Sequence, residues 1–184
     1  MKIIIIGSST GGPYILENIL KDFPILKVAI VIVQHLPPAF NKSFNSHIAS
    51  LTKMGVFIID DHTRLSERNV YIAAAGYHLR VENNRVFRLD SGEKVHGVRP
   101  AVDLTLLSIK KRSEDSIMGI ILTGMGRDGA DGLCYLHRIG GTTIAQDPLT
   151  APIKSMPQAA IETGEVDYIL VPELIREKMI LFGQ

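Results

Sequence analysis

Hydrophobic residues along this chain occur in short continuous runs that alternate with longer segments of helical periodicity. Residues Lys2 to Ile6, Val28 to Val33 and Ile117 to Leu122 are almost uninterrupted apolar runs rich in β-branched side chains, typical of strands buried on both faces of a sheet. After the first run, apolar residues recur on one face at helical spacing: Ile15, Leu16, Ile19, Leu20 and Phe23. The pattern therefore predicts alternating strands and helices.

The rest of the chain continues this alternation, except in its middle. Further helices are expected at residues 39–53, 99–111, 130–139 and 156–163. Further strands are expected at 56–59, 70–75, 142–145 and 168–171, and the strand at 168–171 is the last element predicted. Residues 79–89 have the pattern of a hairpin that turns at Asn83 and Asn84, which both tolerate a positive φ. The predicted fold class is α/β: a doubly wound, mostly parallel sheet with helices on both faces and a small antiparallel hairpin.

Composition and charge narrow the class of protein. Of the 184 residues, 46% are apolar, and 20 basic side chains stand against 19 acidic ones, for a net charge of +1. A net charge so close to zero gives no electrostatic reason to expect nucleic acid or anionic lipid as a partner. The longest apolar runs are far shorter than a membrane span. Because Cys134 is the only cysteine, no internal disulfide can form, and a cytoplasmic location is expected.

The loop after the first strand carries the best candidate for a nucleophile. Residues Gly7 to Gly11 match the G-x-S-x-G turn that exposes a serine between a strand and a helix, with Ser9 at its centre. The free N–H groups of the following helix would suit an oxyanion. The same residues also fit a phosphate-binding loop or a simple tight turn, and Ser8 is a neighbouring competitor.

A histidine and an aspartate follow two other buried strands. Of the six histidines, only His35 ends such a strand, and Asp128 lies in the glycine-rich loop after the strand at 117–122. A serine nucleophile needs a base, and the base needs a carboxylate to orient it. Because ligands bind beyond the carboxyl ends of parallel strands, Ser9, His35 and Asp128 are predicted to form a catalytic triad. Asp128 also suits a helix N-cap, and Asp131 competes with it as the carboxylate.

Other chemistries fit the sequence less well. The order Ser9, His35, Asp128 differs from that of α/β-hydrolases, which place the aspartate before the histidine. Ser9 stands where a dinucleotide-binding loop has its middle glycine, and no acidic residue ends the second strand. No spacing among the histidines resembles a zinc site, and Asp128 and Asp131 do not fit a calcium loop. No metal or cofactor is therefore expected.

Three motifs contain these candidate residues and closely resemble the catalytic domain of the chemotaxis protein-glutamate methylesterases, the CheB family. They are Gly7 to Pro13, Val33 to Pro38 and Leu122 to Ala130. Shorter segments extend the resemblance across nearly the whole chain: Tyr71 to Ala73, His78 to Leu79, Arg99 to Asp103, Ile144 to Asp147 and Met156 to Ala160. The family's catalytic serine, histidine and aspartate fall on Ser9, His35 and Asp128.

The resemblance implies a serine hydrolase that removes methyl groups from glutamate γ-methyl esters of chemoreceptors and releases methanol. Many members also deamidate receptor glutamines. The partners would be the cytoplasmic helical regions of methyl-accepting chemotaxis receptors. Residues 1–184 would form a single CheB-type catalytic domain, without the phosphoacceptor receiver domain that precedes it in typical members. Two other interpretations remain open: a serine esterase or amidase that acts on small molecules, and a non-catalytic phosphate-binding module.

The chain departs from the family pattern at three positions. Ala75 stands where members usually have proline, Val98 where they often have histidine, and Ser155 where glycine is usual. If the loop at Ser155 needs a positive φ, a strained backbone is expected there. If these loops border the site, the rate or the receptor preference would differ from those of other members.

Overall fold

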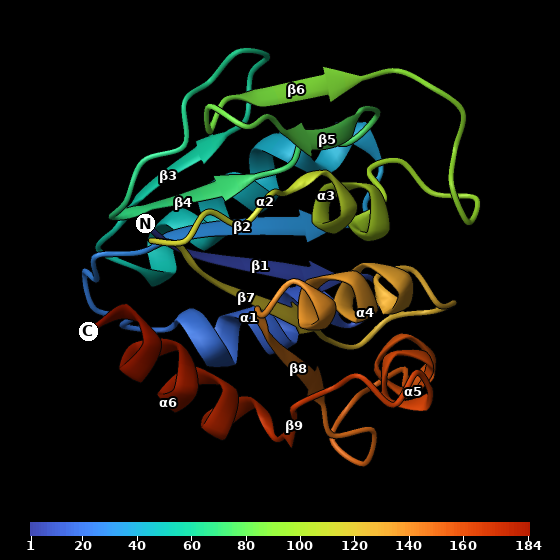
Figure 1. Ribbon diagram of the computed structural model, residues 1–184. Helices are drawn as coiled ribbons and strands as arrows, with labels where there is room; N and C mark the ends of the chain where they lie inside the picture. Colours follow the sequence, from blue (N-terminus) through green and yellow to red (C-terminus); the bar gives the residue numbers. More distant parts are fainter.

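The computed structural model describes all of residues 1–184 and contains one central parallel sheet with helices on both of its faces (Figure 1). Its strands are β1 (Lys2–Ser8), β2 (Ala29–Gln34), β3 (Gly55–Ile58), β4 (Asn69–Ile72), β7 (Ser116–Ile121), β8 (Thr142–Gln146) and β9 (Tyr168–Leu170). They lie in the order β3-β4-β2-β1-β7-β8-β9, and every neighbouring pair is parallel. The prediction of a doubly wound, mostly parallel α/β sheet is confirmed.

The helices divide into two layers. They are α1 (Gly12–Leu20), α2 (Asn41–Leu51), α3 (Val102–Ser108), α4 (Ala130–Arg138), α5 (Ser155–Glu162) and α6 (Pro172–Gly183), with a short 3-10 helix, η1 (Pro38–Phe40), before α2. Residues of α3, α4 and α5 belong to one hydrophobic core, and residues of α1, α2 and α6 belong to the other. No helix is both long enough and apolar enough to cross a lipid bilayer.

Strand β1 lies in the middle of the sheet and contributes to both cores. Ile3 and Ile5 are completely buried in the core that contains α3, α4 and α5, whereas Ile4 and Ile6 are completely buried in the core that contains α1, α2 and α6. Successive side chains of a strand point to opposite faces, so a strand covered on both sides needs an apolar residue at every position. The uninterrupted isoleucine run of the sequence reflects this position.

The predicted hairpin is present, but its turn differs from the prediction. Strands β5 (His78–Val81) and β6 (Phe87–Asp90) pair antiparallel, separate from the main sheet. The residue with a positive φ is Arg85, at 65°, rather than Asn83 or Asn84. The Arg85 side chain is buried in an ion pair with Asp115. This buried ion pair explains how an arginine occupies a conformation that local preference assigns to asparagine.

The sequence analysis missed the last helix, α6, and residue 155 does not meet the condition under which strain was expected there. Helix α6 begins at Pro172, which suits a first helical turn, and buries Ile175 and Met179 one turn apart. Leu174 and Leu181 of the same helix are exposed, so its sequence shows no single apolar face. Ser155 begins α5 and does not have a positive φ, so no glycine is needed at this position.

Candidate active site

The loops after β1, β2 and β7 meet at the carboxyl edge of the sheet. Gly7 pairs with Val33 of β2 on one side and with Ile121 of β7 on the other, so the three strands end at the same level. The chain leaves β1 toward β2 on one side and later builds β7, β8 and β9 on the other, which makes this edge a topological switch point. The N–H group of Ser9 donates to the carbonyl oxygen of Thr123 (N···O 3.0 Å) and joins two of these loops.

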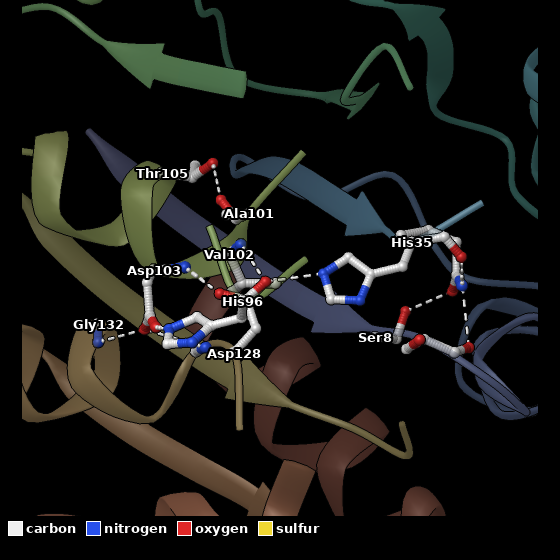
Figure 2. Close-up of polar contacts among 12 residues, drawn as sticks. Ser8, His35, His96, Ala101, Val102, Asp103, Thr105, Asp128 and Gly132 are labelled. Atoms are coloured by element: carbon white, nitrogen blue, oxygen red, sulfur yellow. Dashed lines mark hydrogen bonds and ion pairs between the residues drawn. The ribbon is translucent and has the colours of Figure 1, made fainter. Parts of the chain in front are cut away.

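The structure brings two of the three predicted site residues into direct contact. His35 Nε2 lies 2.7 Å from Asp128 Oδ2, and Figure 2 shows the imidazole directed from the end of β2 toward this carboxylate. Asp128 is buried, with an exposed fraction of 2%, and the His35 side chain is 9% exposed. The other ring nitrogen, Nδ1, is also buried and has no hydrogen-bond partner. Nε2 is thus fixed by Asp128, and Nδ1 is free to accept a proton.

Ser9 lies beside this pair, in the wall of a cavity. The cavity has a volume of about 470 Å³ and is lined by both Ser9 and His35. Because His35 Nδ1 has no partner, the Ser9 hydroxyl is not hydrogen-bonded to the imidazole in this structure. The competing Ser8 is completely buried, and its hydroxyl donates to Gln34 Oε1 (2.6 Å). Of the two serines, only Ser9 lines the cavity.

Asp128 caps a helix, but not the helix that follows it in sequence. Its Oδ2 accepts a hydrogen bond from the N–H group of Val102 (2.7 Å), and its Oδ1 accepts one from the N–H group of Asp103 (3.0 Å). These residues form the first turn of α3. Helix α4, directly after Asp128, has Gly129 as its N-cap, without a side-chain cap. The same carboxylate therefore holds both His35 and the start of α3.

Asp103 caps the start of α4, as Asp128 caps the start of α3. Its Oδ1 accepts hydrogen bonds from the N–H groups of Gly129 (2.9 Å) and Gly132 (2.7 Å), at the start of α4. Its Oδ2 lies 3.0 Å from Nε2 of His96, as Figure 2 shows. The sequence analysis assigned Asp103 no role, although an aspartate in the first turn of a helix is a common sign of capping. The two helices thus exchange caps.

The two buried carboxyl groups have opposite pKa shifts. Burial raises the pKa of Asp128, but hydrogen bonds from His35 and from the N–H groups of Asp103 and Val102 outweigh it, and the net pKa lies below the usual value. For Asp103, burial raises the pKa, the Gly132 N–H group lowers it, and the neighbouring negative charge of Asp128 raises it again. The net pKa of Asp103 therefore lies above the usual value. The lowered pKa keeps Asp128 ionised at neutral pH.

One amide group, to which the sequence analysis assigned no role, connects the loops of the serine and the histidine. Gln34 Nε2 donates to the carbonyl oxygens of Ser9 and His35, both at 2.9 Å, while its Oε1 accepts from Ser8. Gln34 is 2% exposed. A buried glutamine at the end of an otherwise apolar strand was the signal for this role, because such a group needs polar partners.

Two backbone N–H groups near Ser9 are free to donate. Those of Thr10 and Met125 make no hydrogen bond within the protein. Gly124, before Met125, brings its loop close to the serine, since a Cβ atom built there would lie 2.7 Å from the Ser9 Cβ and 3.1 Å from the Ser9 nitrogen. Two N–H groups from different loops are a common way to bind an oxyanion.

One group of side chains has the composition of a metal site, although the sequence analysis expected none. Ligand atoms of His96, Asp103 and Asp131 lie within 4.8 Å of one another. These atoms already have protein partners, however. Both oxygens of Asp131 accept hydrogen bonds from Arg127, at 2.9 and 3.1 Å, and Asp103 is bound to His96 and to α4. The arrangement is satisfied without an ion.

The fold and the site together define a doubly wound α/β protein with a serine, a histidine and an aspartate gathered at the carboxyl edge of its sheet. Residues 4–179 match the family model for CheB methylesterase, and the chain belongs to this family. The resemblance that the sequence motifs indicated is thus confirmed.

Individual relatives agree with this assignment. The chain is 40% identical over 181 residues to a protein-glutamate methylesterase/protein-glutamine glutaminase of Pyrococcus horikoshii, covering 96% of this chain and 49% of that protein. It is 41% identical over 186 residues to the protein of the same name from Thermotoga maritima, with coverages of 97% and 53%. The crystal structure of the Thermotoga maritima CheB methylesterase catalytic domain superimposes with a TM-score of 0.91 at 40% identity, covering 97% of both chains. The chain spans about half the length of the curated relatives that it matches.

Proposed function

We propose that this chain hydrolyses γ-methyl esters of glutamate residues in chemoreceptors and releases methanol. Ser9 acts as the nucleophile, His35 as the general base and acid, and Asp128 as the carboxylate that orients His35. The observation that carries the proposal is the 2.7 Å contact between His35 Nε2 and Asp128 Oδ2, beside the cavity that Ser9 lines. Membership of the CheB family and the names of the relatives support the choice of substrate.

The contact with Asp128 decides which imidazole nitrogen acts as the base. An ionised carboxylate only accepts hydrogen bonds, so His35 Nε2 carries a proton and Nδ1 is left with a lone pair. Nδ1 takes the hydroxyl proton as Ser9 Oγ attacks the ester carbonyl carbon. The free N–H groups of Thr10 and Met125 stabilise the oxyanion of the tetrahedral intermediate.

Ser9 and His35 also carry out the remaining steps of the reaction. His35 Nδ1 returns its proton to the departing methoxide, which leaves as methanol, and Ser9 remains as an acyl ester of the glutamate side chain. His35 then deprotonates a water molecule that attacks this ester, and protonates Ser9 Oγ as the glutamate carboxylate is released. Asp128 stabilises the positive imidazolium in both halves of the cycle.

Three further parts of the proposal rest on the family. The same steps with ammonia as the leaving group would convert receptor glutamine to glutamate, which matches the second half of the relatives' names. The partners are the cytoplasmic helical regions of methyl-accepting chemotaxis receptors, and the chain works in the cytoplasm, where its free Cys134 stays reduced. Residues 1–184 act as one catalytic domain, matched over 97% of its length by the Thermotoga maritima catalytic domain.

The test is methanol release from methylated receptor fragments by wild-type protein and by Ser9→Ala. We expect Ser9→Ala to lose at least about a thousandfold in kcat, because the nucleophile is removed. Its circular dichroism and unfolding midpoint should stay close to wild type, since the Ser9 hydroxyl makes no hydrogen bond to His35. A folded Ser9→Ala protein with full turnover would refute the mechanism. Release of methanol from small esters but not from receptor fragments would refute the substrate.

A further inference from the structure

A second cavity adjoins the one that Ser9 lines. It has a volume of about 560 Å³ and shares three lining residues, His35, Leu36 and Pro37, with the first cavity. A substrate with its ester group at Ser9 has room to extend past His35 into the second cavity. This cavity is not used by the hydrolytic steps, and its chemistry differs from that of the first.

The second cavity is positively charged. Lys94 and Arg99 both line it, and no acidic residue lines either cavity. Neither side chain makes an ion pair. Lys94 is exposed, Arg99 is half-buried, and neither has a carboxylate within 4.0 Å. Of the nine other arginines of the chain, five make ion pairs. These two cations remain available to a ligand.

Arg99 is held in place by neutral groups. Its Nη1 donates to the carbonyl oxygens of Ser91 (2.8 Å) and Gly92 (2.7 Å). These bonds fix the guanidinium without neutralising its charge, and so reduce the entropy that a ligand would otherwise lose by ordering it. A planar, preoriented guanidinium beside a mobile ammonium group is well suited to a carboxylate.

We propose that the cavity bordered by Lys94 and Arg99 is a subsite for an acidic side chain of the substrate, one that flanks the esterified glutamate. The inference rests on the proposed function, which supplies a peptide substrate. A methyl ester has no charge and gains nothing from two cations, so their ligand is a different group on the same substrate. A carboxylate fits because the cavity offers two positive charges and no negative one. The subsite makes hydrolysis faster where the ester has acidic neighbours.

One of the positions at which the chain departs from the family pattern lies in this subsite. Val98, where other members often have histidine, lines this cavity next to Arg99. A neutral, apolar side chain there leaves Lys94 and Arg99 as the only permanent charges in the wall. The charge of the subsite is therefore independent of histidine protonation at this position.

The experiment compares two methylated receptor fragments, one with acidic residues around the ester and one with alanine at those positions. We measure kcat/KM for both with wild type, Lys94→Gln and Lys94→Arg. Wild type should prefer the acidic fragment, and Lys94→Gln should reduce this preference about two- to fivefold, mainly through KM, as expected for one partly exposed charge pair. The preference should also fall with added salt. Lys94→Arg keeps the charge and should retain the preference.

Lys27→Gln is the matched control. Lys27 is exposed and precedes β2, at the opposite, amino edge of the sheet, so its loss changes the net charge equally without touching the subsite. An unchanged preference in Lys94→Gln, or an equal loss in Lys27→Gln, would overturn the proposal. Affinity of the Ser9→Ala protein for the two fragments, with and without Lys94→Gln, gives the same comparison without turnover. Failure of hydrolysis and failure of the subsite are thereby separated.

Discussion

At the scale of single residues, the amide group of Gln34 is the link that joins the loop of Ser9 to the loop of His35. It makes three hydrogen bonds of 2.6 to 2.9 Å, to Ser8 and to the carbonyl oxygens of the two site residues. Each partner left unpaired in a buried place costs about 1–3 kcal/mol. Gln34 is therefore a positioning residue: it borders the cavity that Ser9 lines, but its amide group is engaged in fixing the two loops that carry the reacting side chains.

The variant Gln34→Met tests this role, because methionine keeps the volume and removes the amide. We expect the free energy of unfolding to fall by about 2–4 kcal/mol and kcat to fall more than tenfold, with a smaller change in KM. Thr143→Val is the control, since Thr143 is an equally buried polar residue near the opposite, amino end of β8, where its hydroxyl bonds to Glu165 and Asp167. Equal losses of kcat in the two variants would leave Gln34 with a purely structural role.

At the scale of elements, helices α3 and α4 are tied together by exchanged caps. Asp128, from the loop before α4, holds the first turn of α3, and Asp103 of α3 holds the first turn of α4. The candidate orienting carboxylate is therefore fixed by a helix start as well as by His35. This explains why a glycine-rich loop can hold Asp128 in one position.

The raised pKa of Asp103 predicts how stability depends on pH. The folded protein keeps a proton on Asp103 above about pH 4, the usual pKa of an aspartate, where the unfolded chain has released it. The contribution of Asp103 to the free energy of unfolding therefore falls as pH rises from its pKa in the unfolded chain to its pKa in the folded protein. In urea unfolding from pH 4 to 7, the stability advantage of wild type over Asp103→Asn should shrink with rising pH. An advantage that grows instead would mean that the pKa is lowered.

At the scale of the whole molecule, three buried strands end together at the carboxyl edge of the sheet, which explains why much of the candidate site could be predicted. Buried runs marked the strands, and the rule that ligands bind beyond their carboxyl ends placed Ser9, His35 and Asp128 together before any contact was known. What the sequence did not predict depends on neighbours distant along the chain. Asp128 and Asp103 exchange caps across 25 residues, and Arg85, which has a positive φ, is held in a buried ion pair with the distant Asp115. Local patterns contain no information about such pairs.

The most direct test of the central claim is to identify the serine that becomes covalently modified. Wild type treated with a fluorophosphonate, digested and examined by mass spectrometry should carry one adduct, on Ser9, because Ser9 lines the cavity beside His35. Ser8 serves as an internal control in the same peptide, since it is buried and bound to Gln34. Labelling of Ser9, lost in Ser9→Ala, is the predicted result. Labelling of Ser8, or methanol release by a protein that takes no label, would contradict the account.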